Sequence, residues 1–240
     1  MTKYIFDVDG VLCDTGQHID PEFAEYFESW TKDKEYYLVT GSPRHKTANQ
    51  IGGELTLKSK IGYHCLGNSI WTENGREVVV NRFHFSDNER EFIKDQYDQV
   101  MFHRKQDWNE AIEMRPGSVN LSFVKRGASV EMRQGFVEFD NFYQTRINVI
   151  KQIKEYYPRF DCYLGGDCSI DIVLRGANKG QIFNWSFDPT VKHYFFGDRC
   201  DPHGIDQPLY DEVQRVGGEA FHIKEGYKET WEILKSLEIK

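Results

Sequence analysis

Short apolar runs alternate with longer stretches in which apolar residues recur at helical spacing, and this alternation opens the chain. An apolar run at residues 4–8 precedes a helical pattern at 22–30, and a second apolar run follows at 36–39. A strand, a helix and a strand in this order predict a parallel sheet covered by helices. The alternation returns late in the chain, where it predicts two strands and a closing helix, at residues 193–196, 219–223 and 228–237.

Three shorter runs follow the first unit and extend the expected sheet. They lie at residues 62–66, 69–72 and 77–80. The last two are separated by Glu73, Asn74 and Gly75, which are typical of a hairpin turn.

Between residues 82 and 178 the alternation gives way to a run of strands with two helices. One helix is expected from Ser86 to about Phe102, and apolar residues at helical spacing between Tyr143 and Tyr157 indicate another. Strands are expected at residues 111–114, 119–124, 129–132, 160–164 and 169–174. Helices beside a run of strands predict a separate α+β unit. We therefore expect an α/β core, formed by residues 1–81 and 179–240, with an α+β unit inserted at 82–178.

Composition and charge exclude several classes of function. A hydrophobic content of 39% and an aromatic content of 15% are typical of a folded chain rather than a disordered one. The net charge of -8 argues against a nucleic-acid partner, because the chain has no excess of lysine and arginine to displace phosphate counterions. No apolar run reaches the ~18 residues of a membrane span, so no membrane partner is expected.

Cysteine usage and the first residues predict a cytoplasmic location. Five cysteines without any Cys-x-x-Cys pair indicate reduced thiols rather than disulfides or a zinc site. Residues 1–3 lead directly into an apolar run and show no signal-peptide pattern.

Two carboxylates close the first apolar run and give the strongest chemical signal in the chain. Asp7 and Asp9 are two residues apart, so at the end of a strand they point the same way, into the crevice where open α/β sheets bind ligands. One carboxylate is suited to attack phosphorus and form an aspartyl phosphate, while the other moves the proton of the leaving or attacking oxygen. A Mg²⁺ ion between them offsets their repulsion. A solvated turn after an edge strand is the alternative that this segment alone leaves open.

Three further segments end at expected strand ends with residues that phosphoryl transfer requires. Thr40 and Ser42 offer hydroxyl and backbone N–H groups to a phosphate oxygen, although Thr40 equally suits a helix cap. Lys179 is able to neutralise a phosphoryl group, although a solvated lysine is commoner. Asp198 follows a buried apolar run and, with Asp206, offers the hard oxygen ligands that Mg²⁺ takes. Four distant segments thus agree on one chemistry.

This order of motifs resembles that of the haloacid dehalogenase superfamily, and the chain is similar over nearly its whole length to the eukaryotic-type phosphomannomutases within it. The correspondences inside the insert lie at residues 112–122, 125–129, 131–133, 165–171 and 176–179. The resemblance implies a Rossmann-like core with a parallel sheet, and an inserted α+β cap domain with an antiparallel sheet and helices. It also makes a homodimer through the cap an expectation.

The resemblance also assigns the residues of the cap side. In such enzymes arginines clamp the phosphate remote from the reacting one, while a serine and an aspartate hold sugar hydroxyls. The matching residues here are Arg115, Arg126, Arg133, Ser169 and Asp171. Guanidinium forks bind phosphate well, but arginines in this region also have acidic neighbours such as Glu113 and Glu131 with which to pair.

On the core side, the expected catalytic residues are Asp7, Asp9, Thr40 and Lys179, and Ser42 is expected among the substrate contacts. The expected metal ligands are Asp7, Asp9, Asp198 and Asp206. For Asp201 and His203 three roles stay open: metal ligand, support of a ligand, or turn residue.

Several positions depart from the family pattern. Val11 stands where the family usually has threonine, and Gly16 stands where the mutases carry an arginine, so one contact to the phosphosugar is expected to be missing. The second motif, 40–42, leaves open whether Thr40 or Ser42 contacts the phosphate, and the fourth motif ends differently at 202–206.

Together these features predict a phosphomannomutase-like phosphohexomutase that interconverts hexose 6-phosphate and hexose 1-phosphate with Mg²⁺. The alternative is a sugar-phosphate phosphatase, in which water rather than a sugar hydroxyl accepts the phosphoryl group. A third hypothesis is a non-catalytic sugar-phosphate-binding relative, which would have no need of a nucleophile.

Overall fold

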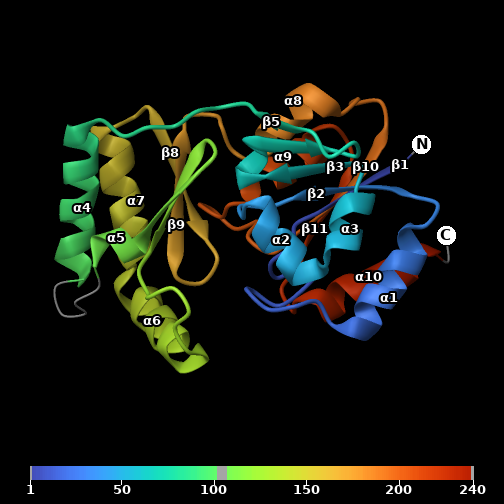
Figure 1. Cartoon of the computed structure of the whole chain (residues 1–240), viewed down its shortest axis with the longest axis horizontal. Helices are drawn as coiled ribbons and strands as arrows, with labels where there is room; N and C mark the ends of the chain where they lie inside the picture. Colours follow the sequence, from blue (N-terminus) through green and yellow to red (C-terminus); the bar gives the residue numbers. More distant parts are fainter. Residues whose placement is uncertain (1, 102–106, 239–240) are drawn as a thin grey trace.

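The computed structural model describes residues 2–101 and 107–238, which form two lobes, each built on its own β-sheet (Figure 1). The larger lobe, called the core, holds a seven-stranded sheet, and the smaller, called the cap, holds a four-stranded antiparallel sheet. The predicted α/β core with an inserted α+β unit is therefore confirmed. Its boundaries at residues 81/82 and 178/179 stay a prediction.

The core sheet has the strand order β11-β10-β1-β2-β3-β4-β5. Its first five strands are parallel: β11 (Glu219–His222), β10 (Lys192–Gly197), β1 (Thr2–Phe6), β2 (Glu35–Val39) and β3 (Ile61–His64). The sheet ends in an antiparallel hairpin formed by β4 (Ser69–Thr72) and β5 (Glu77–Val79). The predicted turn between these strands is confirmed, since Gly75 has φ +71° and donates its N–H to the Thr72 carbonyl at 2.9 Å.

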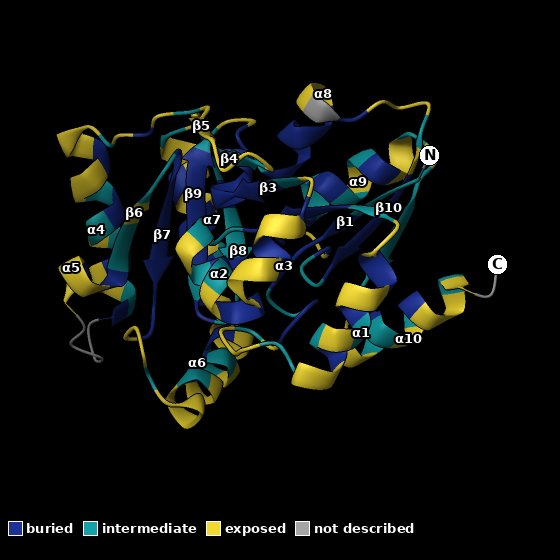
Figure 2. Cartoon of the chain, turned by 45° about the vertical axis from the view of Figure 1, so that its right-hand side comes forward, coloured by how far each residue is buried: buried dark blue, intermediate teal, exposed yellow. Residues whose placement is uncertain are grey.

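Helices cover both faces of the core sheet because its central strands are apolar on both sides. Phe6 and Leu38 pack toward one layer, formed by α1 (Pro21–Thr31), α2 (Arg44–Ile51), α3 (Gly53–Lys58) and α10 (Tyr227–Glu238). The neighbouring residues Ile5 and Tyr37 pack toward the other, which contains α8 (Phe183–Ser186) and α9 (Gln207–Arg215). Figure 2 shows the buried strands of the core sheet between helices that expose their outer faces.

The cap sheet has the order β6-β7-β9-β8, with bounds Ile112–Arg115, Ser118–Ser122, Ser169–Leu174 and Phe160–Gly165. On its outer face lie α4 (Asp87–Met101) and α7 (Thr145–Tyr156), while α5 (Trp108–Ala111) and α6 (Val130–Tyr143) flank the sheet. Apolar residues such as Val119 and Ile172 pack among the helices. Alternate residues such as Asn120 and Asp171 face the core instead.

One predicted strand and several bounds are wrong. Residues 129–132 are not a strand but the start of α6, in which the Ser129 hydroxyl accepts from the Met132 N–H at 3.4 Å as an N-cap. Tyr143 ends this helix, and Gln144, at φ 52°, separates it from α7. β1 stops at Phe6 rather than residue 8. Phe102, the expected end of the first cap helix, lies outside the described residues.

One fully buried side chain contacts both connections between the lobes. Asn68 follows a short 3₁₀ turn, η1 (Cys65–Gly67). On the outward connection its side-chain Oδ1 accepts from Asn81 Nδ2 at 2.7 Å, and its backbone carbonyl accepts from the Val80 N–H at 2.9 Å. On the return connection its side-chain Nδ2 donates to the Ala177 carbonyl at 3.1 Å. The return connection leads into a second 3₁₀ turn, η2 (Lys179–Ile182).

Within the described ranges, no helix has the length and apolar character needed to cross a lipid bilayer. The cytoplasmic location stays a prediction.

Candidate active site

A cavity of about 410 Å³ lies between the carboxyl ends of the core strands and the polar face of the cap sheet. Every predicted site residue except Asp206 lines it. Its lining contains seven basic and five acidic side chains, a local excess of positive charge on a chain whose net charge is -8. The cavity therefore suits an anionic ligand.

Asp7 lies directly after β1 at the centre of the core sheet. Its N–H donates to the Phe196 carbonyl at 2.9 Å, which continues the pairing of β1 with β10. Its carboxylate is 4% exposed, and its Oδ1 lies 2.9 Å from Lys179 Nζ. Burial raises the pKa of Asp7 well above its usual range, and the Asp206 carboxylate adds to this, while Lys179 opposes both. The Asp7 carboxyl group thus lies at the floor of the cavity, paired with Lys179.

Lys179 is fully buried between two carboxylates at the start of η2. Its Nζ lies 2.9 Å from Asp7 and donates to Asp206 Oδ1 at 2.6 Å. Burial alone would lower the pKa of Lys179, but Asp206 and Asp7 outweigh it and raise that pKa above the ordinary value. The lysine therefore stays a cation. Asp206 Oδ2 accepts from the Arg199 backbone N–H at 3.0 Å, so each oxygen of Asp206 accepts a hydrogen bond from the protein.

Three carboxylates gather beside this lysine. Asp7, Asp198 and Asp206 each offer an oxygen, and these oxygens lie within 4.8 Å of one another. Burial, and after it the Asp206 carboxylate, raises the pKa of Asp198 to about 8, while Arg199 and Lys179 oppose this. A hard divalent cation takes such carboxylates and relieves their repulsion, so the donor set fits Mg²⁺.

Asp9 is not a member of this acidic group. Its Oδ1 accepts from the Gly16 N–H at 2.8 Å and from Gln50 Nε2 at 2.7 Å. These two donors fix the carboxylate at the cavity wall, where it is partly exposed. The expectation that Asp9 is a metal ligand stays a prediction. Gln50 comes from α2, and no motif in the sequence indicates its role.

Thr40 and Ser42 follow β2 and both line the cavity. Thr40 Oγ1 accepts from the Ser42 N–H at 3.1 Å, so the hydroxyl stabilises the turn before α2. Thr40 is buried, whereas Ser42 is partly exposed. Which of the two hydroxyls contacts a phosphate stays open.

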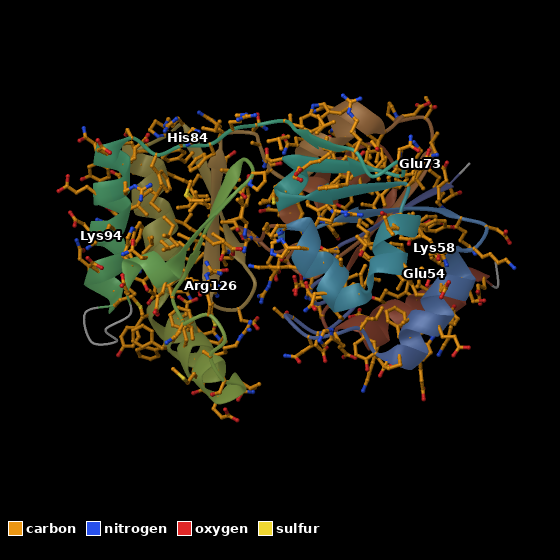
Figure 3. All side chains as sticks on the ribbon, viewed as in Figure 1. Glu54, Lys58, Glu73, His84, Lys94 and Arg126 are labelled. Atoms are coloured by element: carbon orange, nitrogen blue, oxygen red, sulfur yellow. The ribbon has the colours of Figure 1, made fainter. Side chains whose placement is uncertain are left out.

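Two of the predicted arginines are paired with Glu113, the neighbour that the sequence offers as a partner. Arg115 donates to Glu113 Oε2 at 2.7 Å, and Arg126 Nη1 lies 3.1 Å from the same oxygen. Arg115 also crosses to the core, where it donates to the Gly41 carbonyl at 2.9 Å. Figure 3 shows Arg126 on the side of the cap nearer the core, with Lys94 on the outer edge.

Glu113 binds a further cation from the core. Lys46 Nζ donates to its two oxygens at 2.6 and 2.8 Å. Burial would raise the pKa of Glu113, but Arg115 and Lys46 outweigh it and lower that pKa to about 2. The glutamate therefore stays charged and holds cations of both lobes.

A buried amide connects the predicted sugar-binding residues. Asn120 Nδ2 donates to Ser169 Oγ at 3.0 Å and to Asp171 Oδ1 at 3.1 Å. Burial raises the pKa of Asp171, while Arg115 opposes this. Sequence reasoning missed Asn120, but Ser118, Asn120 and Ser122 recur at every second position of β7, and this polar face was the available signal.

Two residues of the fourth motif lie outside the cavity lining. Asp201 is exposed, and its Oδ2 is 3.6 Å from His222 Nε2. His203 has φ 70°, and its N–H donates to Gln207 Oε1 at 3.1 Å, as in a turn.

The family model described as eukaryotic phosphomannomutase matches residues 23–236, which is most of the chain. The chain belongs to this family.

Curated members of the eukaryotic phosphomannomutase family match over almost their full length. A probable phosphomannomutase of Caenorhabditis elegans is 27% identical, with 99% of this chain and 97% of the relative covered. A phosphomannomutase of Drosophila melanogaster is 26% identical, with 96% and 94% covered.

Solved structures share the two-lobed fold at low identity. An IMP-bound, N-terminally truncated IMP-nucleotidase of Plasmodium falciparum superposes with a TM-score of 0.62 at 15% identity, covering 100% of this chain and 68% of the other. A trehalose-6-phosphate phosphatase related protein gives a TM-score of 0.57 at 17% identity, with 99% and 97% covered. These structures therefore share the fold of this chain, an α/β core with an inserted α+β cap.

Proposed function

We propose that this protein is a Mg²⁺-dependent phosphohexomutase that interconverts hexose 1-phosphate and hexose 6-phosphate through an aspartyl phosphate on Asp7. One observation carries the proposal: a single cavity has the Asp7–Lys179 pair on its core side and arginines on its cap side. A mutase needs both, because its bisphosphorylated intermediate must bind in two orientations. Membership of the eukaryotic phosphomannomutase family supports the same activity.

In the first half-reaction an Asp7 oxygen attacks phosphorus while the bond from phosphorus to the sugar oxygen breaks. Asp9, oriented by Gly16 and Gln50, donates a proton to that leaving oxygen. In the second half-reaction Asp9 takes a proton from the attacking sugar hydroxyl, and Asp7 is released. Lys179 compensates negative charge beside Asp7 throughout.

Asp7, Asp198 and Asp206 would hold a Mg²⁺ ion, which would supply a Lewis acid for the phosphoryl oxygens. On the cap side, Arg115, Arg126 and Arg133 are the proposed contacts of the phosphate that does not react, while Ser169 and Asp171 are those of the sugar hydroxyls. Thr40 or Ser42 contacts the phosphoryl group being transferred.

The decisive assay supplies mannose 1-phosphate, Mg²⁺ and a catalytic amount of hexose 1,6-bisphosphate, and follows sugar isomerisation and inorganic phosphate together. Isomerised sugar without stoichiometric phosphate release is expected. Rapid phosphate release without isomerisation would instead establish a sugar-phosphate phosphatase. That second candidate is favoured by Gly16, which leaves the first loop of the core without a cation for the sugar phosphate.

Replacement of the nucleophile tests the chemistry in both cases. Asp7→Asn is expected to reduce turnover by at least about 10⁴-fold, because an amide does not form the covalent intermediate. Asp33→Asn, an exposed change outside the cavity, is the matched control. Substantial activity in Asp7→Asn would refute the assignment.

We also propose a homodimer formed through the cap. Support comes from α6, whose Val130, Met132, Phe142 and Tyr143 are all exposed apolar or aromatic side chains.

A further inference from the structure

Two arginines from different lobes share one carboxylate at the cavity wall. Arg199, which follows Asp198 in the core, donates from Nη2 to Asp167 Oδ1 at 2.5 Å. Arg133, on α6 of the cap, has its Nη2 3.8 Å from the other oxygen of Asp167. Asp167 itself lies in the loop between β8 and β9, and all three side chains line the cavity.

The cluster of Arg133, Asp167 and Arg199 is more exposed than the two cations that are buried in the cavity wall, Arg115 and Lys179. The side chains of Arg133, Asp167 and Arg199 are 35%, 37% and 32% exposed. Arg115 is 7% exposed and Lys179 is fully buried, and each is held by two carboxylates. The half-exposed carboxylate of Asp167, which Arg199 and Arg133 share, is exchanged for another anion more easily than the more buried carboxylates that hold Arg115 and Lys179. Arg199 Nε also lies 3.4 Å from Asp198 Oδ2.

A phosphate group is the stronger partner for these guanidinium groups. An ion pair as exposed as that of Asp167 contributes only about 0–1 kcal/mol, while a phosphate dianion offers Arg more charge and a bidentate geometry. Asp167 and Arg199 also line a neighbouring hollow of about 460 Å³, so the carboxylate has solvent space into which to turn.

The core loop that follows Asp7 places no cationic side chain beside Arg133. No lysine or arginine occurs between Asp7 and Asp20. At its nearest point stands Gly16, where an added Cβ would lie 3.6 Å from Arg133 Nη1. A cation for a phosphate beside Arg133 must therefore come from another part of the core, and Arg199 is within reach of the same carboxylate.

We propose that Arg199 is a substrate-binding residue: it binds, together with Arg133, the phosphate of the substrate that is not being transferred, and Asp167 occupies that phosphate's place until the substrate arrives. The inference rests on the proposed function, since it requires a sugar carrying a second phosphate. Because Arg199 belongs to the core and Arg133 to the cap, one phosphate binds both lobes. Asp167 touches no reacting atom and acts as a positioning residue for the two arginines.

The test measures the Kd of glucose 1,6-bisphosphate with Mg²⁺ by calorimetry, in full-length protein carrying Asp7→Asn so that the ligand is not turned over. Arg199→Gln is expected to raise this Kd about tenfold or more, the value for a lost charge-assisted hydrogen bond. Asp167→Asn is expected to lower it, by up to about fivefold, because the competing carboxylate is gone. Arg215→Gln, exposed on α9 and paired only locally with Glu212, is the matched control and should change nothing.

The opposite signs of the two effects separate this inference from a simple bridge between lobes. If the Arg199–Asp167 pair only held the lobes together, both variants would weaken binding to a similar extent, and that result overturns the inference. A Kd in Arg199→Gln equal to that of the control also overturns it. Isomerisation by the unsubstituted enzyme tests the proposed function separately. If the enzyme is an active mutase but Arg199→Gln leaves the Kd unchanged, this inference is refuted and the proposed function is not.

Discussion

At the scale of single residues, Glu113 determines how the cationic side of the cavity is arranged. It accepts from Arg115 and Lys46, and Arg126 lies 3.1 Å away. Three cations that would repel one another are thereby held around one carboxylate. The low pKa of Glu113, about 2, is the consequence of this arrangement, since Arg115 and Lys46 outweigh the effect of burial.

The depressed pKa makes the stability of the protein depend on pH in a defined direction. In the unfolded chain Glu113 protonates near its ordinary pKa of about 4.3, but in the folded chain only near about 2. Its contribution to stability is fully present above about pH 5 and is lost as the pH falls toward 2. Urea midpoints between pH 6 and pH 3 should therefore fall more in the unsubstituted protein than in Glu113→Gln, which is less stable at pH 6.

Glu155→Gln, on an exposed position of α7, is the control for this comparison and should follow the unsubstituted protein. Parallel stability profiles for Glu113→Gln and the unsubstituted protein would contradict the role assigned to Glu113.

At the scale of elements, the turn between β6 and β7 is where the cap sheet rests on the core. Gly117 in this turn has φ +66°, and an added Cβ would lie 2.5 Å from the Asn68 Cβ. Gly127 has a similar φ of +79° but nothing within 4 Å of an added Cβ. Alanine substitution at the two positions therefore distinguishes the cost of backbone strain from the cost of a clash between the lobes.

Gly127→Ala is expected to cost about 1 kcal/mol of unfolding free energy, from the left-handed backbone alone. Gly117→Ala should cost at least ~2 kcal/mol more, because Asn68 is fully buried and cannot move aside freely. Urea unfolding of the two variants measures the difference. An equal loss of unfolding free energy in the two variants would show that an added Cβ at residue 117 does not clash with Asn68.

Elements and site were predictable from the sequence to different degrees. The apolar runs predict the strands that end directly before Asp7, Thr40 and Asp198. Because the carboxyl ends of parallel strands meet at one edge of a sheet, they also predict that these three residues lie close together. Residues 129–132 predict a strand because they show no helical period, and only the N-cap Ser129 indicates that a helix begins there. Gln50 and Asp167 contact residues that are distant in the sequence, Asp9 and Arg199. No local sequence pattern therefore indicates their roles.

At the scale of the whole molecule, the two lobes are connected on several sides of the cavity. Lys46 binds Glu113 across the cleft, and Arg115 reaches the Gly41 carbonyl. On another side, the Leu164 N–H of β8 donates to the His203 carbonyl of the core at 2.8 Å. A cavity closed in this way limits the access of water to an aspartyl phosphate, which favours transfer to a sugar hydroxyl over hydrolysis.

Weakening one connection should therefore shift the outcome of the reaction. Lys46→Gln is expected to raise the fraction of turnovers that release inorganic phosphate by up to about fivefold, since a half-exposed ion pair contributes at most ~1 kcal/mol. The measurement compares phosphate release with sugar isomerisation in one reaction mixture. Lys58→Gln, at an exposed pair on α3, is the control, and an unchanged ratio in Lys46→Gln would contradict this role of closure.

The position of β1 between β2 and β10 has a consequence for how the protein matures on the ribosome. β1 is synthesised before the cap and its neighbour β10 only after it, so the β10 side of β1 has no partner strand while the cap is translated. Asp198 and Asp206 follow β10 in the sequence and are synthesised after it. The proposed nucleophile, Asp7, is thus made before the cap, whereas Lys179, Asp198 and Asp206 follow the cap, so a nascent chain carries a complete cap before this group of residues can form.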